Sequence, residues 1–248
     1  MYFYSFDVGT PAQRVSGALD ITSDLVWLQC GGCDACLGAA ASAGWLATET
    51  FAFGAARVDG VVFGCGFTNG GVDFGGAVGL GRGPFSLVSQ LGAGRFSYHF
   101  APDDSTTGAD SFILFGSDAA PRTTTTSRAA VSSTPLLASA AYPKFYYVGL
   151  SGVRVDGEDL AIPRGTFDLR TDGSGGVILS ITVPVAFLDE AAYRLVRQAM
   201  VSKIGAPTVD GLAAFGLDLC YTSQSLAKTT IPSMALVFDG DAVMELEA

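Results

Sequence analysis

Apolar residues recur in short strand-like runs along this chain, and turn residues separate the runs. Residues 2–6 and 96–100 are two such runs, and 32 glycines punctuate the sequence at short intervals. Alternating apolar positions place every second side chain on one face of a β-strand. The pattern predicts an all-β chain with few short helices.

Two segments depart from the alternation and predict helices. Residues 83–92 carry a proline near the start and a glycine past the end, as helices commonly do. Asp189 is expected to cap the second helix, which should end before Gly205. The apolar residues expected on one face of this second helix are Val196, Met200 and Ile204.

A polar, low-complexity stretch lies near the middle of the chain. Residues 123–127 are four threonines and a serine, flanked by Arg122 and Arg128. Such a stretch is typical of a loop between structured segments. We therefore expect two domains, residues 1–126 and residues 127–248.

Composition narrows the choice of function classes. The 248 residues are 49% hydrophobic and 15% charged, which fits a globular protein with a sizeable core. The formal net charge of -10 would repel a phosphate backbone and offers no polybasic face to acidic lipids. The longest apolar run, residues 177–188, is interrupted by polar residues and is too short to cross a membrane. Nucleic acid and membranes are therefore not expected partners.

The cysteines are odd in number, so they cannot all pair within the chain. The spacing of the first three is compatible with zinc or redox chemistry, but the one histidine, His99, has no partner histidine for a second ligand pair. We favour disulfide remnants of a secreted ancestor, and we expect no metal and no cofactor. The five cysteines are Cys30, Cys33, Cys36, Cys65 and Cys220.

Two short segments far apart in the sequence are alike. Residues 19–23 read Leu-Asp-Ile-Thr-Ser and residues 179–183 read Leu-Ser-Ile-Thr-Val, and each closes an apolar run. Asp20 and Ser180 occupy the same place in the two segments. One motif therefore occurs twice, once with a carboxylate and once with a hydroxyl.

The first copy, within residues 6–30, resembles the first active-site loop of pepsin-like aspartic proteases, which reads Asp-Thr-Gly-Ser. The second copy, within residues 175–193, resembles the second loop of the plant nepenthesin-like branch, which reads Asp-Ser-Gly-Thr. Other segments that match the family in the right order are residues 63–66, 77–83, 96–98 and 145–150. The resemblance implies a pepsin-like bilobal fold with a peptide or protein ligand in the cleft between the lobes.

In that family two carboxylates share one proton, and the pair activates water for peptide-bond hydrolysis. The resemblance assigns Asp20 to the first catalytic position and Ser180 to the second. A serine hydroxyl cannot exchange a proton near neutral or acid pH as a carboxyl does. We therefore expect a catalytically defective relative of the aspartic endopeptidases, with Ser23 and Trp27 as candidate substrate-binding residues.

Both loops carry isoleucine and threonine where relatives have a hydroxyl residue and glycine. The branched side chains of Thr22 and Thr182 are expected to crowd positions that favour glycine. The matched Ile21 and Ile181 predict two apolar side chains that pack where a polar contact joins the loops of relatives. Drift after the loss of catalysis is the alternative explanation.

Parts of the family pattern have no counterpart. No tyrosine can be assigned to the flap, because relatives carry a longer insert between the positions of Cys36 and Gly44. The chain ends where relatives continue, so we expect an incomplete second lobe with unpaired sheet edges. Relatives are typically secreted or vacuolar, but no signal peptide precedes residues 2–6, so the compartment stays unassigned.

Three alternatives stay open. The first is an active or weak aspartic endopeptidase, including one that takes its second carboxylate from another chain. The second is a non-catalytic protein-binding module that resembles the cereal xylanase inhibitors. The third is the product of a truncated gene that does not fold stably. Peptide hydrolysis at acid pH separates the first alternative from the others.

Overall fold

The computed structural model describes residues 2–30, 42–69, 75–101, 110–120, 131–183, 185–209 and 216–246. The chain divides into two compact units, which we describe separately. The first unit contains residues 1–131, 138–146 and 178–185, and the second contains residues 132–137, 147–177 and 186–248. In the part of the chain that the structure describes, no helix is long and apolar enough to span a membrane.

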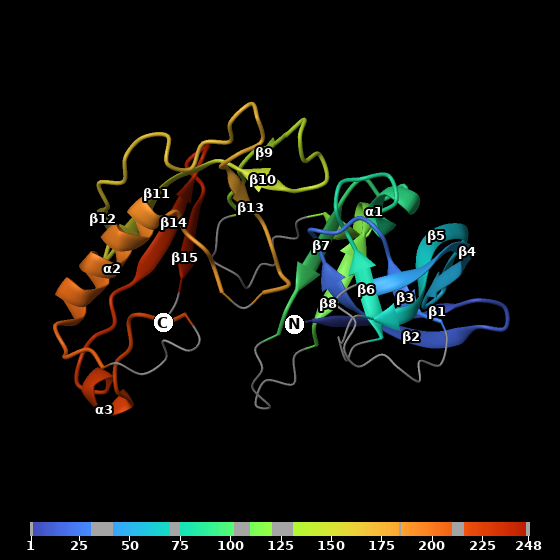
Figure 1. The fold of residues 1–248 in the computed structure, drawn as a ribbon, viewed down its shortest axis with the longest axis horizontal. Coiled ribbons are helices and arrows are strands. Elements are labelled where there is room, and N and C mark those ends of the chain that lie inside the picture. Colours follow the sequence, from blue (N-terminus) through green and yellow to red (C-terminus); the bar gives the residue numbers. More distant parts are fainter. Residues whose placement is uncertain are drawn as a thin grey trace. The chain divides into compact units, whose positions relative to one another are not determined.

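A closed six-stranded barrel forms the centre of the first unit (Figure 1). Around the barrel the strands follow the order β1-β2-β6-β3-β5-β4. Closure leaves no free edge in this sheet, which removes a common route to aggregation. The strands are β1 (Phe3–Val8), β2 (Gln13–Asp20), β3 (Trp27–Gln29), β4 (Ser42–Phe53), β5 (Ala56–Asn69) and β6 (Gly76–Gly79).

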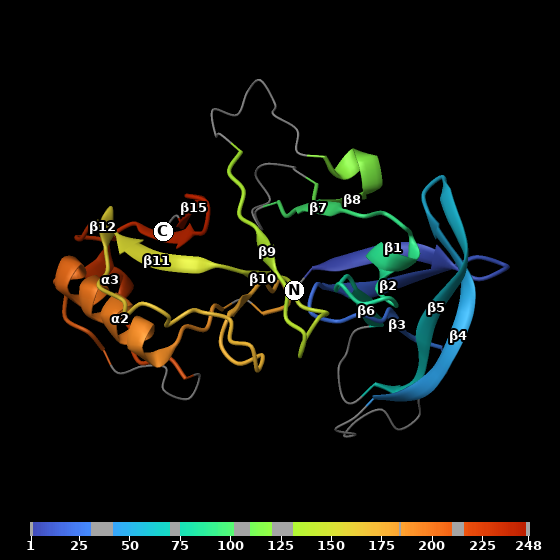
Figure 2. The same cartoon turned by 90° about the horizontal axis from the view of Figure 1, so that it is seen from above.

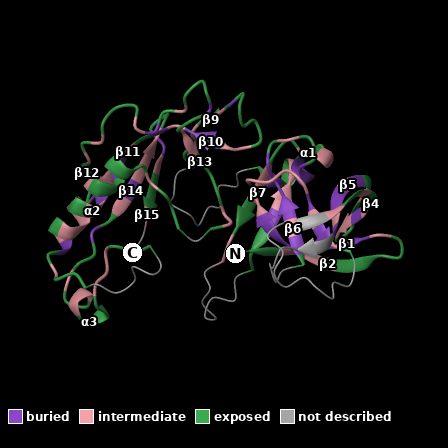
Figure 3. Cartoon of the chain, in the orientation of Figure 1, coloured by how far each residue is buried: buried purple, intermediate pink, exposed green. Residues whose placement is uncertain are grey.

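Aromatic side chains fill the barrel. Phe6 of β1 and Phe51 of β4 are fully buried, with ring centroids 5.2 Å apart, and the Phe63 ring lies 5.5 Å from that of Phe51. Figure 3 shows buried positions gathered along these strands. The long β4–β5 hairpin runs past the other strands (Figure 2), and its two-residue turn contains Gly54 at a φ of 61°. The alternation seen in the sequence thus becomes one buried face per strand.

Four smaller elements complete the first unit. They are α1 (Leu87–Gln90), β7 (Phe96–His99), β8 (Phe112–Phe115) and a 3-10 turn at Gly116–Ala119. The helix expected within residues 83–92 exists, but it is shorter than predicted. It begins late because the Ser86 side chain accepts from Ser89 N at 3.2 Å and so caps the helix there. The proline and the phenylalanine before Ser86 therefore lie in a turn.

A four-stranded antiparallel sheet and one long helix form the core of the second unit. The sheet order is β12-β11-β14-β15, and a separate small sheet has the order β13-β10-β9. The helix α2 (Glu190–Ile204) lies against β11 (Figure 1). The remaining elements are β9 (Leu136–Leu137), β10 (Tyr147–Val148), β11 (Leu150–Val155), β12 (Glu158–Asp159), β13 (Val177–Ile178), α3 (Ser223–Leu226), β14 (Met234–Phe238) and β15 (Val243–Leu246).

The helix α2 confirms the prediction made from its caps. The Asp189 carboxylate accepts from Ala191 N at 2.9 Å, and Gly205 ends the helix in the left-handed region. The apolar face packs against the core of the second unit, with Val196 and Met200 both in contact with it. The four-residue helix α3, capped by Thr222, was not predicted, because one turn leaves no periodicity to detect.

The prediction of a mostly β fold with few short helices is confirmed. The predicted boundary between residues 126 and 127 lies outside the described residues and stays a prediction. Two segments beyond that boundary, residues 138–146 and 178–185, pack with the barrel unit. The chain therefore returns to the first unit twice after leaving it.

Candidate functional site

The first loop begins where strand β2 ends. Asp20 is the last residue of β2, which runs parallel to β6 and pairs Asp20 with Gly79. Leu80 N donates to Asp20 O at 2.8 Å, and Gly81 N donates to Ser23 O at 2.8 Å. The barrel therefore holds the backbone of residues 20–23 from the β6 side.

A second carboxylate, that of Asp24, fixes the far side of this loop. Gly83 N donates to Asp24 Oδ1 at 2.8 Å. A Cβ atom at Gly83 would lie 2.0 Å from Asp24 Oδ2, so any larger residue there must displace the carboxylate. At Gly81 a Cβ atom would lie 2.6 Å from Asp24 Oδ1. The glycines within residues 77–83 are thus explained by the close approach of Asp24.

Three donors converge on one oxygen of Asp20. Thr22 N donates to Oδ1 at 2.8 Å, Thr22 Oγ1 donates at 2.6 Å, and Thr182 Oγ1 donates at 3.1 Å. Burial by itself raises the pKa of Asp20, but the hydrogen bonds from Thr22 and Thr182, together with the nearby Ser23 hydroxyl, outweigh it. The pKa therefore lies below the usual value, and the carboxylate is held in its ionised form.

The two candidate substrate-binding residues lie on or beside this loop. Ser23 Oγ is buried and makes no hydrogen bond of regular geometry to a described residue, although its hydroxyl favours ionised Asp20. The Trp27 ring lies against the barrel backbone, where a Cβ at Gly64 or Gly66 would come within 2.8 Å of it. This packing explains why glycines line its site. Contact of Ser23 and Trp27 with a substrate stays a prediction.

The second loop repeats the turn of the first. Ser180 Oγ accepts from Thr182 N at 3.3 Å, as Asp20 Oδ1 accepts from Thr22 N two residues on. Both are side-chain turns that Asp and Ser commonly form. Ser180 is exposed, whereas Asp20 is half-buried. The likeness of residues 19–23 and 179–183 thus extends to their local hydrogen bonding.

The threonines do not strain either loop. Among the described residues, the non-glycine positions with positive φ are Asp156 and Asp241, so Thr22 and Thr182 keep an ordinary backbone. The crowding expected of their side chains is replaced by hydrogen bonds to Asp20. Sequence reasoning missed the bond of Thr182, because nothing local indicates a contact with a residue 162 positions away.

The two isoleucines share one hydrophobic cluster. Ile21 is 2% exposed and belongs to the barrel core, and Ile181 is partly buried and packs against that core. The second loop therefore contributes an apolar side chain to the first unit. This is the arrangement expected if the matched isoleucines stabilise the pair of loops.

The cysteines form one disulfide among the described residues. Cys30 pairs with Cys65, which joins the end of β3 to the neighbouring β5, and Cys220 is a free thiol. Cys33 and Cys36 lie outside the described residues. Elsewhere in the described ranges, no group of three His, Cys, Asp or Glu side chains is placed to hold a metal ion.

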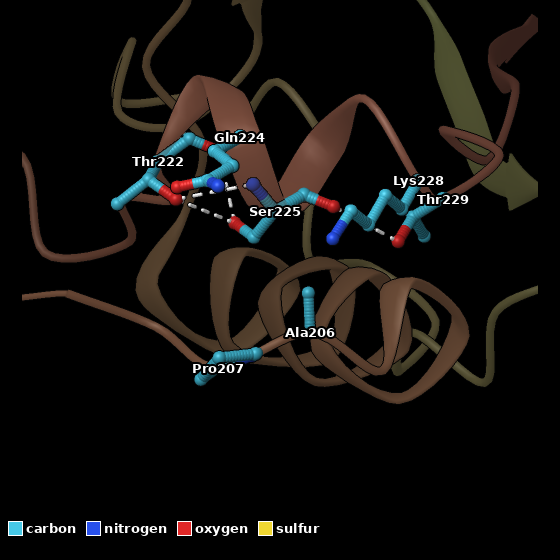
Figure 4. A pocket seen from close by; sticks show the side chains of 7 residues that line it. All are labelled: Ala206, Pro207, Thr222, Gln224, Ser225, Lys228 and Thr229. Atoms are coloured by element: carbon cyan, nitrogen blue, oxygen red, sulfur yellow. Dashed lines mark hydrogen bonds between the residues drawn. The ribbon is translucent and has the colours of Figure 1, made fainter.

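The second unit contains a hollow of about 410 Å³ beside α3 (Figure 4). Its one charged lining residue is Lys228, and the others are small or polar. Thr222 and Ser225 bond to each other at 3.0 Å, so these hydroxyls are already paired. No lining residue comes from either loop. The residues lining the hollow are Ala206, Pro207, Thr222, Gln224, Ser225, Lys228 and Thr229.

Two family profiles match this chain. The profile described as "Xylanase inhibitor N-terminal" matches residues 35–117, and the one described as "Xylanase inhibitor C-terminal" matches residues 145–248. Together they cover most of the sequence, with one profile in each predicted domain.

Curated relatives are plant aspartic proteases. Nepenthesin-2 of Nepenthes gracilis is 31% identical over 288 residues, and nepenthesin-1 of the same plant is 32% identical over 289 residues. Each alignment covers 96% of this chain and 64% of the relative, so the chain spans less than two thirds of their length. The protein named Aspartic protease in guard cell 2, from Arabidopsis thaliana, is 29% identical, and the alignment covers 100% of this chain and 61% of that protein.

Solved structures share the fold at low sequence identity. The structure titled edgp has a TM-score of 0.72 at 15% identity, and the match covers 100% of this chain and 78% of that one. Basic 7S globulin from soybean has a TM-score of 0.69 at 17% identity, and the match covers 99% of this chain and 78% of that one. These likenesses support the fold and say nothing of activity.

Proposed function

Because this chain belongs to the pepsin-like aspartic protease family, of the nepenthesin-like plant branch, we propose that it is a member that has lost catalysis. Asp20 stands for the first catalytic aspartate, and Ser180 stands where the second would be. Hydrolysis by this family needs two carboxylates that share one proton. A carboxylate paired with a serine has no such proton to share.

The observation that carries this proposal is that the two matching turns hold one carboxylate, Asp20, and one hydroxyl, Ser180. Asp20 Oδ1 accepts from Thr22 and from Thr182, and the pKa is lowered as a result. A lone ionised carboxylate can accept a proton from water, but hydrolysis also needs an acid that donates a proton to the peptide. The serine hydroxyl of the equivalent turn does not supply that acid.

Acid-pH hydrolysis of a denatured protein substrate or a peptide library tests the proposal. The purified chain, shown to be folded by circular dichroism, should cleave no faster than its Asp20→Ala variant. The reference is a variant in which the aspartate and glycine positions of the family motif are restored in both loops. It carries Ser180→Asp, Thr22→Gly and Thr182→Gly. Hydrolysis by the native chain that is blocked by pepstatin and lost in Asp20→Ala would refute the loss of catalysis.

A protein-binding role is the second candidate, favoured by the xylanase inhibitor descriptions of both matched profiles. The partner would be a glycosidase, held by surface loops without cleavage. Inhibition of a purified xylanase at equimolar chain would support this role. Full xylanase activity in the presence of excess chain would exclude that enzyme as the partner. A peptide ligand that contacts Ser23 and Trp27 stays a prediction.

A further inference from the structure

Residues 178–185, which we call the strap, pack with the barrel unit although residues on both sides of them belong to the second unit. Leu179 N donates to Tyr146 O at 3.0 Å, and Tyr146 Oη donates to Leu80 O at 2.8 Å. Leu80 in turn is bonded to the backbone of Asp20. A chain of hydrogen bonds therefore leads from the strap to the first loop.

Hydrophobic burial holds the strap only weakly. Ile181 packs against the barrel core, but the other apolar side chains that the structure describes in the strap are more than one third exposed. Stabilisation by burial scales with the apolar area removed from water, so each of these gains little. The exposed apolar residues are Ile178 at 39%, Leu179 at 38%, Val183 at 48% and Val185 at 51%.

The strap has one polar side chain that reaches the barrel in the described part of the chain. Thr182 Oγ1 donates to Asp20 Oδ1 at 3.1 Å, while the Ser180 side chain bonds only within the strap. A hydrogen bond to an ionised acceptor is about twice as strong as one between neutral groups. The half-buried position of both partners limits competition from water.

We propose that Asp20 serves as the anchor of this internal strap, which Thr182 fastens to the first loop. Asp20 thereby holds a segment of the chain in place, and this contact needs no second carboxylate. The inference extends the proposed loss of catalysis, because it gives the remaining carboxylate a structural role. Replacing Ser180 alone would leave the contact in place.

Amide hydrogen exchange of the full chain, read by mass spectrometry, tests the anchor. In Thr182→Val, which removes the hydroxyl but keeps the branched shape, amides of the strap should exchange about tenfold faster, since a bond to a charged group is lost. Amides of β1 and β2 should exchange at the native rate. The matched control, Thr182→Ser, keeps a hydroxyl and should protect the strap nearly as well as the native residue.

Asp20→Asn supplies the other half of the test. A neutral acceptor makes a weaker bond, so the strap should exchange faster than in the native chain. Adding Thr182→Val to Asp20→Asn should accelerate the strap much less than Thr182→Val does alone, because the two residues form one contact. The anchor would be overturned if the strap amides of Thr182→Val exchanged at the native rate. It would also be overturned if the effects of the two substitutions were fully additive.

The exchange experiment does not depend on activity. A chain that cleaved peptide but showed an Asp20-dependent strap would refute only the proposed function. A chain that cleaved no peptide, and whose strap amides exchanged at the same rate with or without the Thr182 hydroxyl, would refute only the anchor. Both readouts use the same protein preparation.

Discussion

The first and second loops have the same turn but very different support. Asp20 ends an eight-residue strand of a closed barrel, and Gly83 holds the loop through its bond to Asp24. Ser180 follows the two-residue strand β13 and is exposed. The comparison teaches that the same local turn can form around a carboxylate or around a hydroxyl. The Thr182 side chain of the second loop bonds to the better supported first loop.

The isoleucines should show the largest difference between the loops. Ile21→Ala should destabilise the folded chain by about 3 kcal/mol, because a fully buried side chain leaves a cavity. Ile181→Ala should cost about 1 kcal/mol, because its side chain is only partly buried. Urea unfolding followed by circular dichroism measures both. Equal losses would contradict the unequal support of the two loops.

The next largest loss of stability should come from replacing Gly83, which lies against Asp24 of the first loop. Gly83→Ala should cost about 2 kcal/mol, since the added Cβ would lie 2.0 Å from Asp24 Oδ2 and must displace the carboxylate. The control is Gly152→Ala, where no atom lies within 4 Å of the added Cβ. Thermal unfolding of both variants measures the difference in stability between them. A Gly83→Ala variant as stable as the control would show that Asp24 does not fix the loop.

A smaller effect should follow the loss of the Thr22 hydroxyl. Thr22→Val removes the 2.6 Å hydrogen bond to Asp20 Oδ1 but leaves the bond from Thr22 N in place. The expected cost is about 1.5 kcal/mol, which is typical of a hydrogen bond to a charged group. Urea unfolding at pH 6 measures it. The same substitution should raise the Asp20 pKa, and an unchanged pKa would argue against the bond.

The smallest effect is a pH dependence that belongs to the first loop alone. Hydrogen bonds lower the Asp20 pKa in the folded state, so the unfolded chain binds this proton more tightly. The resulting stabilisation is complete above the pKa of aspartate in the unfolded chain, about 3.9. It is lost as the pH falls through the lower pKa of Asp20 in the folded chain. Asp20→Asn should flatten the fall in stability below about pH 4. Ser180→Ala should leave that fall unchanged.

Sequence patterns predicted the features that depend on neighbouring residues. The β alternation, the cap of α2 at Asp189 and the likeness of the two loops are all local signals. The short length of α1 was missed because Ser86 competes with Pro84 as the place where a helix begins. A propensity argument cannot rank two adjacent start signals.

The features that depend on distant residues could not be read from sequence. The Cys30–Cys65 pairing needs the register of β3 on β5, and an odd set of cysteines leaves many pairings open. The bond between Thr182 and Asp20 needs the strap to return to the barrel. Both threonines were expected to crowd their loops, because without coordinates their hydroxyls had no visible partner.

Titration of the Asp20 carboxyl carbon by NMR tests the central claim most directly. Selective carbon-13 labelling of aspartate, with Asp20→Asn to assign the signal, gives its pKa in the folded chain. A lone, hydrogen-bonded carboxylate predicts one simple titration with a midpoint below the ordinary aspartate value. A midpoint raised above that value, or two coupled steps of a shared proton, would contradict the account, since those are the signs of an intact pair.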